Sequence, residues 1–279
     1  MMSASTYAKA ALTALRRGPQ KATAPARTVT EEHRIDPAEW ARFQRVTSGP
    51  VGNSVSPAYL HTLGFLPSLE LMADSQFPLP VLGMVHVYNR FGLLEPVWVG
   101  DELAVETAVS APRRHPKGAV VDIKVTGRRG GAPVFEETLV YLAKGAELID
   151  ADEGEAVPRI EWEADSLPTA QWKLDPAIGR SYAAVSGDRN PIHLSGVAAK
   201  AFGFPRRIAH GMYTAARALN ATDVASETYV WEIQFAKPLL LPSTVDFSLQ
   251  RAGESVTTAV TRKSDRAPHV ISKITPLGA

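Results

Sequence analysis

The stretch Tyr182-Ala-Ala-Val-Ser-Gly-Asp-Arg-Asn-Pro-Ile-His193 places an aspartate and a histidine five residues apart, on either side of the pair Asn190-Pro191. Proline disfavours the α region for the residue before it and has no N–H of its own, so an uninterrupted helix cannot run through this pair. We therefore expect a turn that brings Asp188 and His193 together at the mouth of a cleft. There a carboxylate and an imidazole can act on one water molecule.

A second short motif, Ile208-Ala-His-Gly-Met212, follows soon after and leads into a segment with helical spacing. The small and apolar residues of that segment are Met212, Ala215, Ala216 and Leu219. Their spacing predicts a helix whose packing side is rich in alanine, so that a sheet can lie close to it. Gly211 would stand at the start of this helix, where backbone N–H groups have no partner within the helix.

Together, Ser186-Gly-Asp188-x-Asn190-Pro191-x-His193 and Ala209-His-Gly-Met212 resemble the R-specific enoyl-thioester hydratases, the MaoC-like dehydratase family. The organisation of the whole chain is similar to the double-hotdog members, among them the actinobacterial (3R)-hydroxyacyl-thioester dehydratases of fatty-acid elongation. The resemblance implies an α+β double hotdog, in which each of two tandem folds wraps an antiparallel sheet around a central helix. It also implies reversible hydration of trans-2-enoyl thioesters to (3R)-3-hydroxyacyl thioesters. The substrate would be carried on coenzyme A or on the phosphopantetheine of an acyl carrier protein, with no metal and no redox cofactor.

The resemblance also implies a role for each motif residue. Asp188 and His193 would hold and polarise the water, one taking its proton during attack on C3 while the other returns a proton to C2, in an order that stays open. Gly211 would supply a backbone donor for the charge that grows on the thioester oxygen, because glycine lets a ligand approach the backbone closely. Asn190 joins the substrate-binding group mainly as the residue that orders the loop. His210 either approaches the substrate or hydrogen-bonds the loop.

Simpler roles stand beside these. Asp188 and Asn190 are common turn formers, and only the complete motif favours catalysis over a structural role. Arg206 and Arg207, just before the second motif, are either ligands of a carrier phosphate, since arginine pairs with phosphate, or part of a solvated loop.

A metal site would need the carboxylate and histidines of both motifs as ligands. The sequence has no HExxH or comparable metal-binding spacing. We therefore expect no metal at Asp188, His193 and His210.

The composition sets further limits. The chain has 279 residues, 45% hydrophobic and 21% charged, which is typical of two globular domains. Its formal net charge is +1, and no apolar run approaches the roughly 20 residues of a membrane span. We therefore expect neither a nucleic-acid nor a membrane partner. Cysteine is absent, which excludes disulfides and thiolate catalysis and fits a cytoplasmic location.

The pattern along the chain predicts four parts. Residues 1–27 are basic without an acidic residue and form either an arm on the body of the protein or an address signal. Residues 28–145 alternate strand-like runs with turns and predict an antiparallel meander. The resemblance implies that this part is a first, non-catalytic hotdog that accommodates the acyl chain. Residues 146–167 are rich in acidic side chains and predict a solvated linker. Residues 168–279 predict a second hotdog that carries the hydratase motif.

An internal repeat supports two tandem folds. Val85 to Leu103 and Tyr229 to Val245 share the order strand, proline, short apolar run, tight turn and strand. The first half has no Asp-x-Asn-Pro-x-His element, so we predict one active site per chain, in a monomer or a homodimer. In the family the first-half helix is shortened to leave a tunnel, and Pro67 within residues 65–74 predicts a short helix here as well.

Two other functions remain open at this point. A hotdog acyl-thioesterase would place the water on the carbonyl carbon instead of C3. A non-catalytic acyl-binding subunit of an elongation complex would bind the same thioester without turnover, although the complete Asp188 and His193 pair argues against it.

Overall fold

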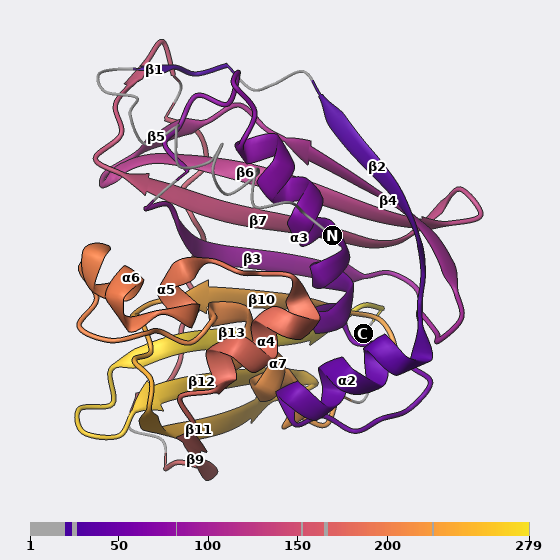
Figure 1. Cartoon of the computed structure of the whole chain (residues 1–279). Helices are drawn as coiled ribbons and strands as arrows, with labels where there is room; N and C mark the ends of the chain where they lie inside the picture. The colour runs from indigo at the N-terminus through magenta and orange to yellow at the C-terminus, as the bar shows by residue number, and fades with distance from the viewer. Residues whose placement is uncertain are drawn as a thin grey trace.

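An eleven-stranded antiparallel sheet runs through the structure, a computed structural model that describes residues 20–23, 27–81, 83–151, 153–164, 167–224 and 226–278 (Figure 1). The strands of the first half lie in the order β2 (Thr28–Arg34), β4 (Glu102–Val109), β6 (Gly118–Arg129), β7 (Ala132–Lys144), β3 (Val85–Leu93). The second half continues with β10 (Tyr229–Phe235), β13 (Pro268–Pro276), β12 (Ser255–Arg262), β11 (Ser243–Ala252), β9 (Ala170–Leu174). A short strand, β5 (Arg113–His115), pairs with β6 alone.

Helices cover one face of this sheet (Figure 1). The first half contributes α2 (Pro37–Thr47) and α3 (Pro57–Met72), and the second contributes α4 (Ile178–Ser186), α5 (Pro191–Leu194), α6 (Gly196–Ala201) and α7 (Gly211–Asn220). The alanines of α7 make close packing possible, since Ala215, Ala216 and Ala218 are all 0% exposed. This agrees with the alanine-rich packing side that the sequence predicts.

The two halves have the same topology in opposite spatial order. Each begins with an edge strand, continues through helices, and then adds four long strands, to which the first half adds the short β5. The central strands β3 and β10 pair antiparallel, from Tyr229 opposite Leu93 to Gln234 opposite Tyr88. An isolated bridge precedes the central helix in both halves, Ser54 to Trp98 before α3 and Ile208 to Leu240 before α7. The prediction of a double hotdog is therefore confirmed.

The predicted short helix in the first half is wrong. Helix α3 extends over 16 residues with Pro67 inside it, and is longer than α7 with 10 residues. An internal proline costs about 3 kcal/mol. Burial of a single large apolar side chain stabilises the folded state by about 1.5–3 kcal/mol, and α3 buries several such side chains. This burial is sufficient to keep the helix intact beyond the proline.

The predicted linker lies across the outer face of the sheet, away from the helices. Ile160 is buried there, and its N–H donates to Gln234 Oε1 of β10 at 2.8 Å. Trp162 packs against the same apolar cluster, while residues 148–149 form β8 and pair in parallel with β1 (Gln20–Lys21). Because one sheet is continuous through both halves, the proposed boundaries at residues 145 and 168 stay predictions.

The predicted basic arm, residues 1–27, lies outside the described residues except for 20–23 and 27. Arg27 pairs with Glu70 of α3 at 2.6 Å. Within the described ranges, the helices are all too short or too polar to cross a bilayer.

Candidate active site

The chain turns at the predicted place between α4 and α5. Helix α4 ends at Ser186, and Gly187 follows in the left-handed conformation with φ of 77°. Glycine adopts this conformation without steric cost, which allows the chain to leave the helix sharply. Pro191 then begins α5 at a position where its missing N–H has no consequence.

Side chains of the motif hold this loop in shape. Asp188 Oδ1 accepts a hydrogen bond from Asn190 N at 3.1 Å, and Asn190 Oδ1 accepts one from Ile192 N at 3.3 Å as the N-cap of α5. Ser186 Oγ accepts a bond from Asp188 N at 3.2 Å. Asn190 thus orders the loop, as the sequence predicts, and the Asp188 carboxylate combines a turn-forming oxygen with a second oxygen that remains available.

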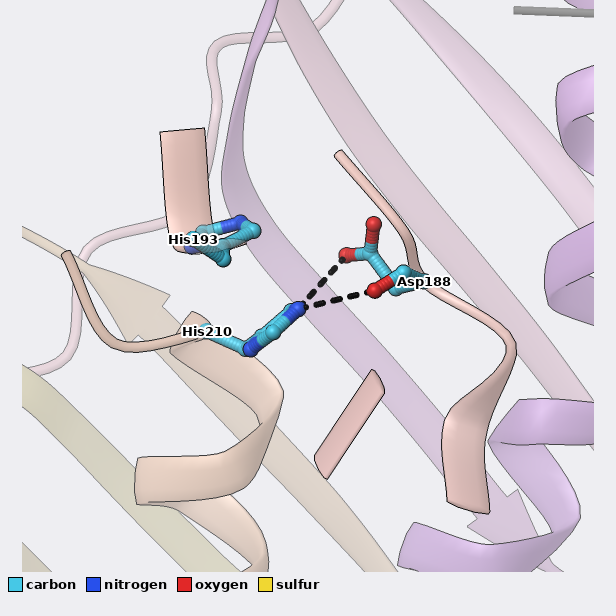
Figure 2. A group of neighbouring side chains, drawn as sticks. All are labelled: Asp188, His193 and His210. Atoms are coloured by element: carbon cyan, nitrogen blue, oxygen red, sulfur yellow. Dashed lines mark hydrogen bonds and ion pairs between the residues drawn. The ribbon is translucent and has the colours of Figure 1, made fainter. Parts of the chain in front are cut away.

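The structure brings Asp188, His193 and His210 together (Figure 2). His210 Nε2 lies 3.0 Å from the main-chain oxygen of Asp188 and 3.8 Å from its Oδ2. The rings of His193 and His210 stack with their centroids 3.7 Å apart. The loop around the proline and the start of α7 therefore meet, so the predicted proximity of Asp188 and His193 is present and includes a third residue.

Hydrogen bonds define which ring nitrogen carries a proton on each histidine. His193 Nδ1 lies 2.9 Å from the carbonyl oxygen of Ile208, which can only accept, so Nδ1 donates. The other nitrogen of a neutral His193, Nε2, then has a free lone pair. His210 donates from Nε2 to the Asp188 carbonyl, and this bond fixes its orientation.

Burial keeps His210 neutral. Its side chain is 2% exposed, and desolvation, with a smaller contribution from His193, lowers the pKa of His210 to about 4 although Asp188 acts in the opposite direction. A neutral His210 with a fixed Nε2 proton is suited to positioning the loop. His193, with its open Nε2, is better placed to accept a proton.

The three residues stand in the wall of a cavity of about 800 Å³. The first turn of α7, from Gly211, forms part of the same wall, and its N–H groups have no acceptors within the helix. A Cβ on Gly211 would meet the ring of Phe235 at 2.7 Å, so glycine is required by the packing of β10 as well as by any ligand.

Asp188, His193 and His210 have one ligand atom each within 4.8 Å of one another, which is close enough for a metal ion. However, the nitrogen by which His210 faces Asp188 carries the proton it donates to a carbonyl. A protonated nitrogen cannot be a ligand, so metal binding would require this bond to break.

The cavity is also lined by residues that were not predicted from the sequence as site residues, namely Tyr182, Ser186, His61 and His86. Burial raises the pKa of Tyr182, whose hydroxyl has no partner among the described residues. His61 and His86 come from the first half, separated from the motif by more than a hundred positions, so no local spacing could have revealed them.

The two predicted phosphate ligands lie elsewhere. Arg206 is exposed and its guanidinium reaches Pro242 O at 3.4 Å, and neither Arg206 nor Arg207 is among the residues that line the cavity. Their role in phosphate binding remains a prediction. The exposed cations Lys117, Lys144, Arg159 and Lys237 line the cavity instead.

Comparison with known proteins agrees with this geometry. The family model described as MaoC like domain matches residues 162–270, which contain the whole motif. The curated 3-hydroxyacyl-thioester dehydratase X of Mycobacterium tuberculosis is 36% identical over 239 residues, covering 85% of this chain and 84% of that protein.

Solved structures give the same result. The crystal structure of HtdX from Mycobacterium tuberculosis has a TM-score of 0.78 at 31% identity, and the match covers 90% of this chain and 100% of that one. A MaoC-like dehydratase from Phytophthora capsici has a TM-score of 0.73 at 19% identity, covering 92% and 97%, and shows the shared fold. The chain therefore belongs to the MaoC-like family of 3-hydroxyacyl-thioester dehydratases.

Proposed function

We propose that the protein catalyses the reversible addition of water to trans-2-enoyl thioesters, giving (3R)-3-hydroxyacyl thioesters. One observation carries the proposal: a carboxylate and a histidine with a free Nε2 meet inside a cavity at the N-terminus of a buried helix. The dehydratase relative of Mycobacterium tuberculosis supports the reaction class.

Asp188 and His193 hold the water between them. The oxygen of the water bonds to C3 as one of its protons passes to one residue of the pair. That proton moves within the pair, and the other residue delivers it to C2, so the pair ends in its starting state and no external acid is consumed. General acid–base help of this kind accelerates reactions by about 10²–10⁴-fold.

As the water oxygen bonds to C3, the electrons of the C2–C3 double bond shift toward the carbonyl group and negative charge develops on the thioester oxygen. The unpaired N–H groups at the start of α7, with Gly211 first, supply hydrogen-bond donors for this oxygen. The positive end of the helix dipole lies at the same point. The start of α7 is therefore complementary to the negative charge of an enolate, which the thioester in its ground state does not have.

The four exposed cations at the cavity suggest how the carrier binds. Lys117, Lys144, Arg159 and Lys237 come from both halves and from the linker. We propose that they attract the phosphates of coenzyme A or phosphopantetheine. If they bind the nucleotide phosphates, crotonyl-CoA should have a lower KM than crotonyl-pantetheine, and Lys117→Gln with Lys144→Gln should raise the KM for CoA more than Lys124→Gln, an exposed lysine of β6.

A turnover assay with the purified protein tests the reaction. Loss of the enoyl absorbance of crotonyl-CoA without release of free thiol, and formation of the (3R) product on chiral analysis, is the expected result. Thiol release with retained enoyl absorbance would identify a thioesterase. Binding of the thioester without change to it would identify an acyl-binding subunit. With zero cysteines in the sequence, a cytoplasmic location remains part of the proposal.

A further inference from the structure

A second polar cluster lies at the centre of the sheet, on the face toward the helices. Its carboxylate is Glu137 of β7, whose Oε1 is 2.7 Å from His61 Nδ1 of α3 and 2.9 Å from Asn89 Nδ2 of β3. The exposed fractions are 3% for Glu137, 4% for His61 and 0% for Asn89. Hydratase chemistry at Asp188 and His193 makes no use of these three side chains.

The cluster is costly to bury. Glu137 Oε2 has no hydrogen-bond partner among the described residues. An unsatisfied buried polar atom costs about 1–3 kcal/mol, and apolar residues of similar volume often stabilise a protein as much as a buried charged cluster. If this part of the wall contacted only hydrocarbon, the cluster would have no stabilising role. We therefore expect the ligand in the cavity to carry a polar group here.

His61 connects the cluster to the cavity. It lines the cavity beside Phe65, while its Nδ1 is occupied by Glu137, so Nε2 is the polar atom that remains for a ligand. Its neighbour His86 also lines the cavity, with the two ring centroids 6.3 Å apart. Burial, with a further contribution from His61, lowers the pKa of His86 to about 3, which keeps His86 neutral.

The cluster lies within reach of a bound acyl chain. His86 packs against Phe235 with a centroid distance of 4.6 Å, and Phe235 in turn contacts Gly211 at the start of α7. The remaining first-half residues of the cavity are mostly apolar, among them Phe65, Leu69 and Met72 of α3. A polar side chain beside a group of apolar ones is the arrangement by which binding sites recognise one oxygen on a hydrophobic ligand.

We propose that His61, held by Glu137 and Asn89, accepts at Nε2 a hydrogen bond from a hydroxyl substituent on the acyl chain, and that the enzyme prefers enoyl thioesters with such a hydroxyl to unsubstituted ones. This inference rests on the proposed hydratase function. Glu137 fixes the tautomer and orientation of His61, as a carboxylate does for a histidine in other sites. His61 is thus a specificity residue, and Glu137 and Asn89 are positioning residues.

The first test needs no variant. The wild-type protein is assayed with trans-2-enoyl-CoA esters of equal length, either unsubstituted or with one hydroxyl group moved along the chain carbon by carbon. One position of the substituent should raise kcat/KM by about tenfold or more, because a site built to hydrogen-bond a substrate group discriminates against the analogue that lacks it. Equal or lower values at every position would overturn the proposal.

The second test removes the hydrogen-bond acceptor. His61→Phe should reduce the preference to about one while keeping turnover of the unsubstituted substrate, and Phe65→Leu, which changes an apolar part of the same wall, should affect both substrates equally. If His61→Phe does not fold, the double variant His61→Phe with Glu137→Met removes the unpaired carboxylate and is assayed in its place. A preference that persists in a folded variant lacking His61 contradicts the inference.

The proposed hydratase function and the role of His61 can be refuted separately. Absence of turnover with every enoyl thioester would refute the proposed hydratase function. Turnover of unsubstituted substrates without any preference would refute only the role of His61.

Discussion

The two halves of this chain build the same strand order around a central helix, yet only the second half has the loop with Asp188 and His193 that we propose as catalytic. In the second half, residues 187–210 separate α4 from α7 and include the short helices α5 and α6. In the first half, residues 48–56 connect α2 to α3 directly. The position after the left-handed residue that ends the first helix is Asp188 in one half and Gly49 in the other.

The equivalent place in the first half is filled by structural hydrogen bonds. Asn220 Nδ2, from the end of α7, donates to Thr47 Oγ1 at 2.9 Å and to Gln44 Oε1 at 3.2 Å. A Cβ on Gly49 would approach Asn220 Nδ2 and Gln44 Oε1 to 2.5 Å, so an aspartate has no room there. A hollow of about 600 Å³ remains nearby, but its described lining contains no histidine and no aspartate. The fold alone therefore does not create the site; the inserted loop does.

The largest expected effect is the loss of the pair that only the second half has. Asp188→Asn or His193→Ala should lower kcat/KM for crotonyl-CoA by about 10²–10⁴-fold, because each removes a proton-transfer group. Initial rates are measured by the enoyl absorbance, and the thermal midpoint shows that the variants are folded. Near-normal rates in either folded variant would show that the chemistry lies elsewhere in the cavity.

The next largest effect is expected on stability, at His210. His210 is the N-cap of α7, and its counterpart in the first half is Ser56, the N-cap of α3, which does not titrate. Burial lowers the pKa of His210 from 6.5 to about 4, so between these values the unfolded chain binds a proton that the folded chain does not. The free energy of unfolding should therefore fall as the pH falls from about 6.5 toward 4, by on the order of 3 kcal/mol from this residue.

Urea unfolding at pH values across this window measures the effect. The variant His210→Gln should have a shallower pH dependence than the wild type, because glutamine does not titrate. An unchanged slope would mean that other groups account for the acid sensitivity.

The part of the molecule that could be predicted from sequence is the part whose determinants are local. Asp188 and His193 are five residues apart, and the proline between them dictates the turn that joins them. The strands could be predicted because alternation along one strand reports which face is buried, as in β4. The length of α3 could not, because the burial that overrides Pro67 comes from distant strands.

The polar cluster shows the same limit for the site. His61 and Glu137 are separated by 76 positions, and no spacing rule joins a helix residue to a strand that far along the chain. A position of His210 near the loop could be predicted only because both motifs together resemble one family. Its stacking on His193 follows from the meeting of α5 with α7, which is a tertiary contact.

A smaller effect on rate is expected at the start of α7. Gly211→Ala keeps the backbone N–H but pushes a methyl group against the Phe235 ring, which a Cβ would approach to 2.7 Å. Displacement of the helix end by up to an ångström should lower kcat by about 10²-fold or less, with little change in KM. Combining it with Phe235→Leu should restore part of the rate, since the clash is then relieved. Failure of the double variant to recover would indicate that the methyl group blocks the substrate directly.

The smallest effect tests whether the first-half network is purely structural. Asn220→Ala removes the donor that joins α7 to α2 and leaves Gln44 and Thr47, which are 3% and 0% exposed, without this partner. The free energy of unfolding should fall by about 1–3 kcal/mol. Asn53→Ala, at an exposed position of the connection between α2 and α3, should leave stability within about 0.5 kcal/mol.

Because Asn220 does not line the catalytic cavity, kcat/KM should stay at the wild-type value in both variants. If Asn220→Ala lost activity while its stability was unchanged, the first half would take part in the reaction beyond forming part of the cavity wall. The proposed division of roles between the two halves would then be wrong.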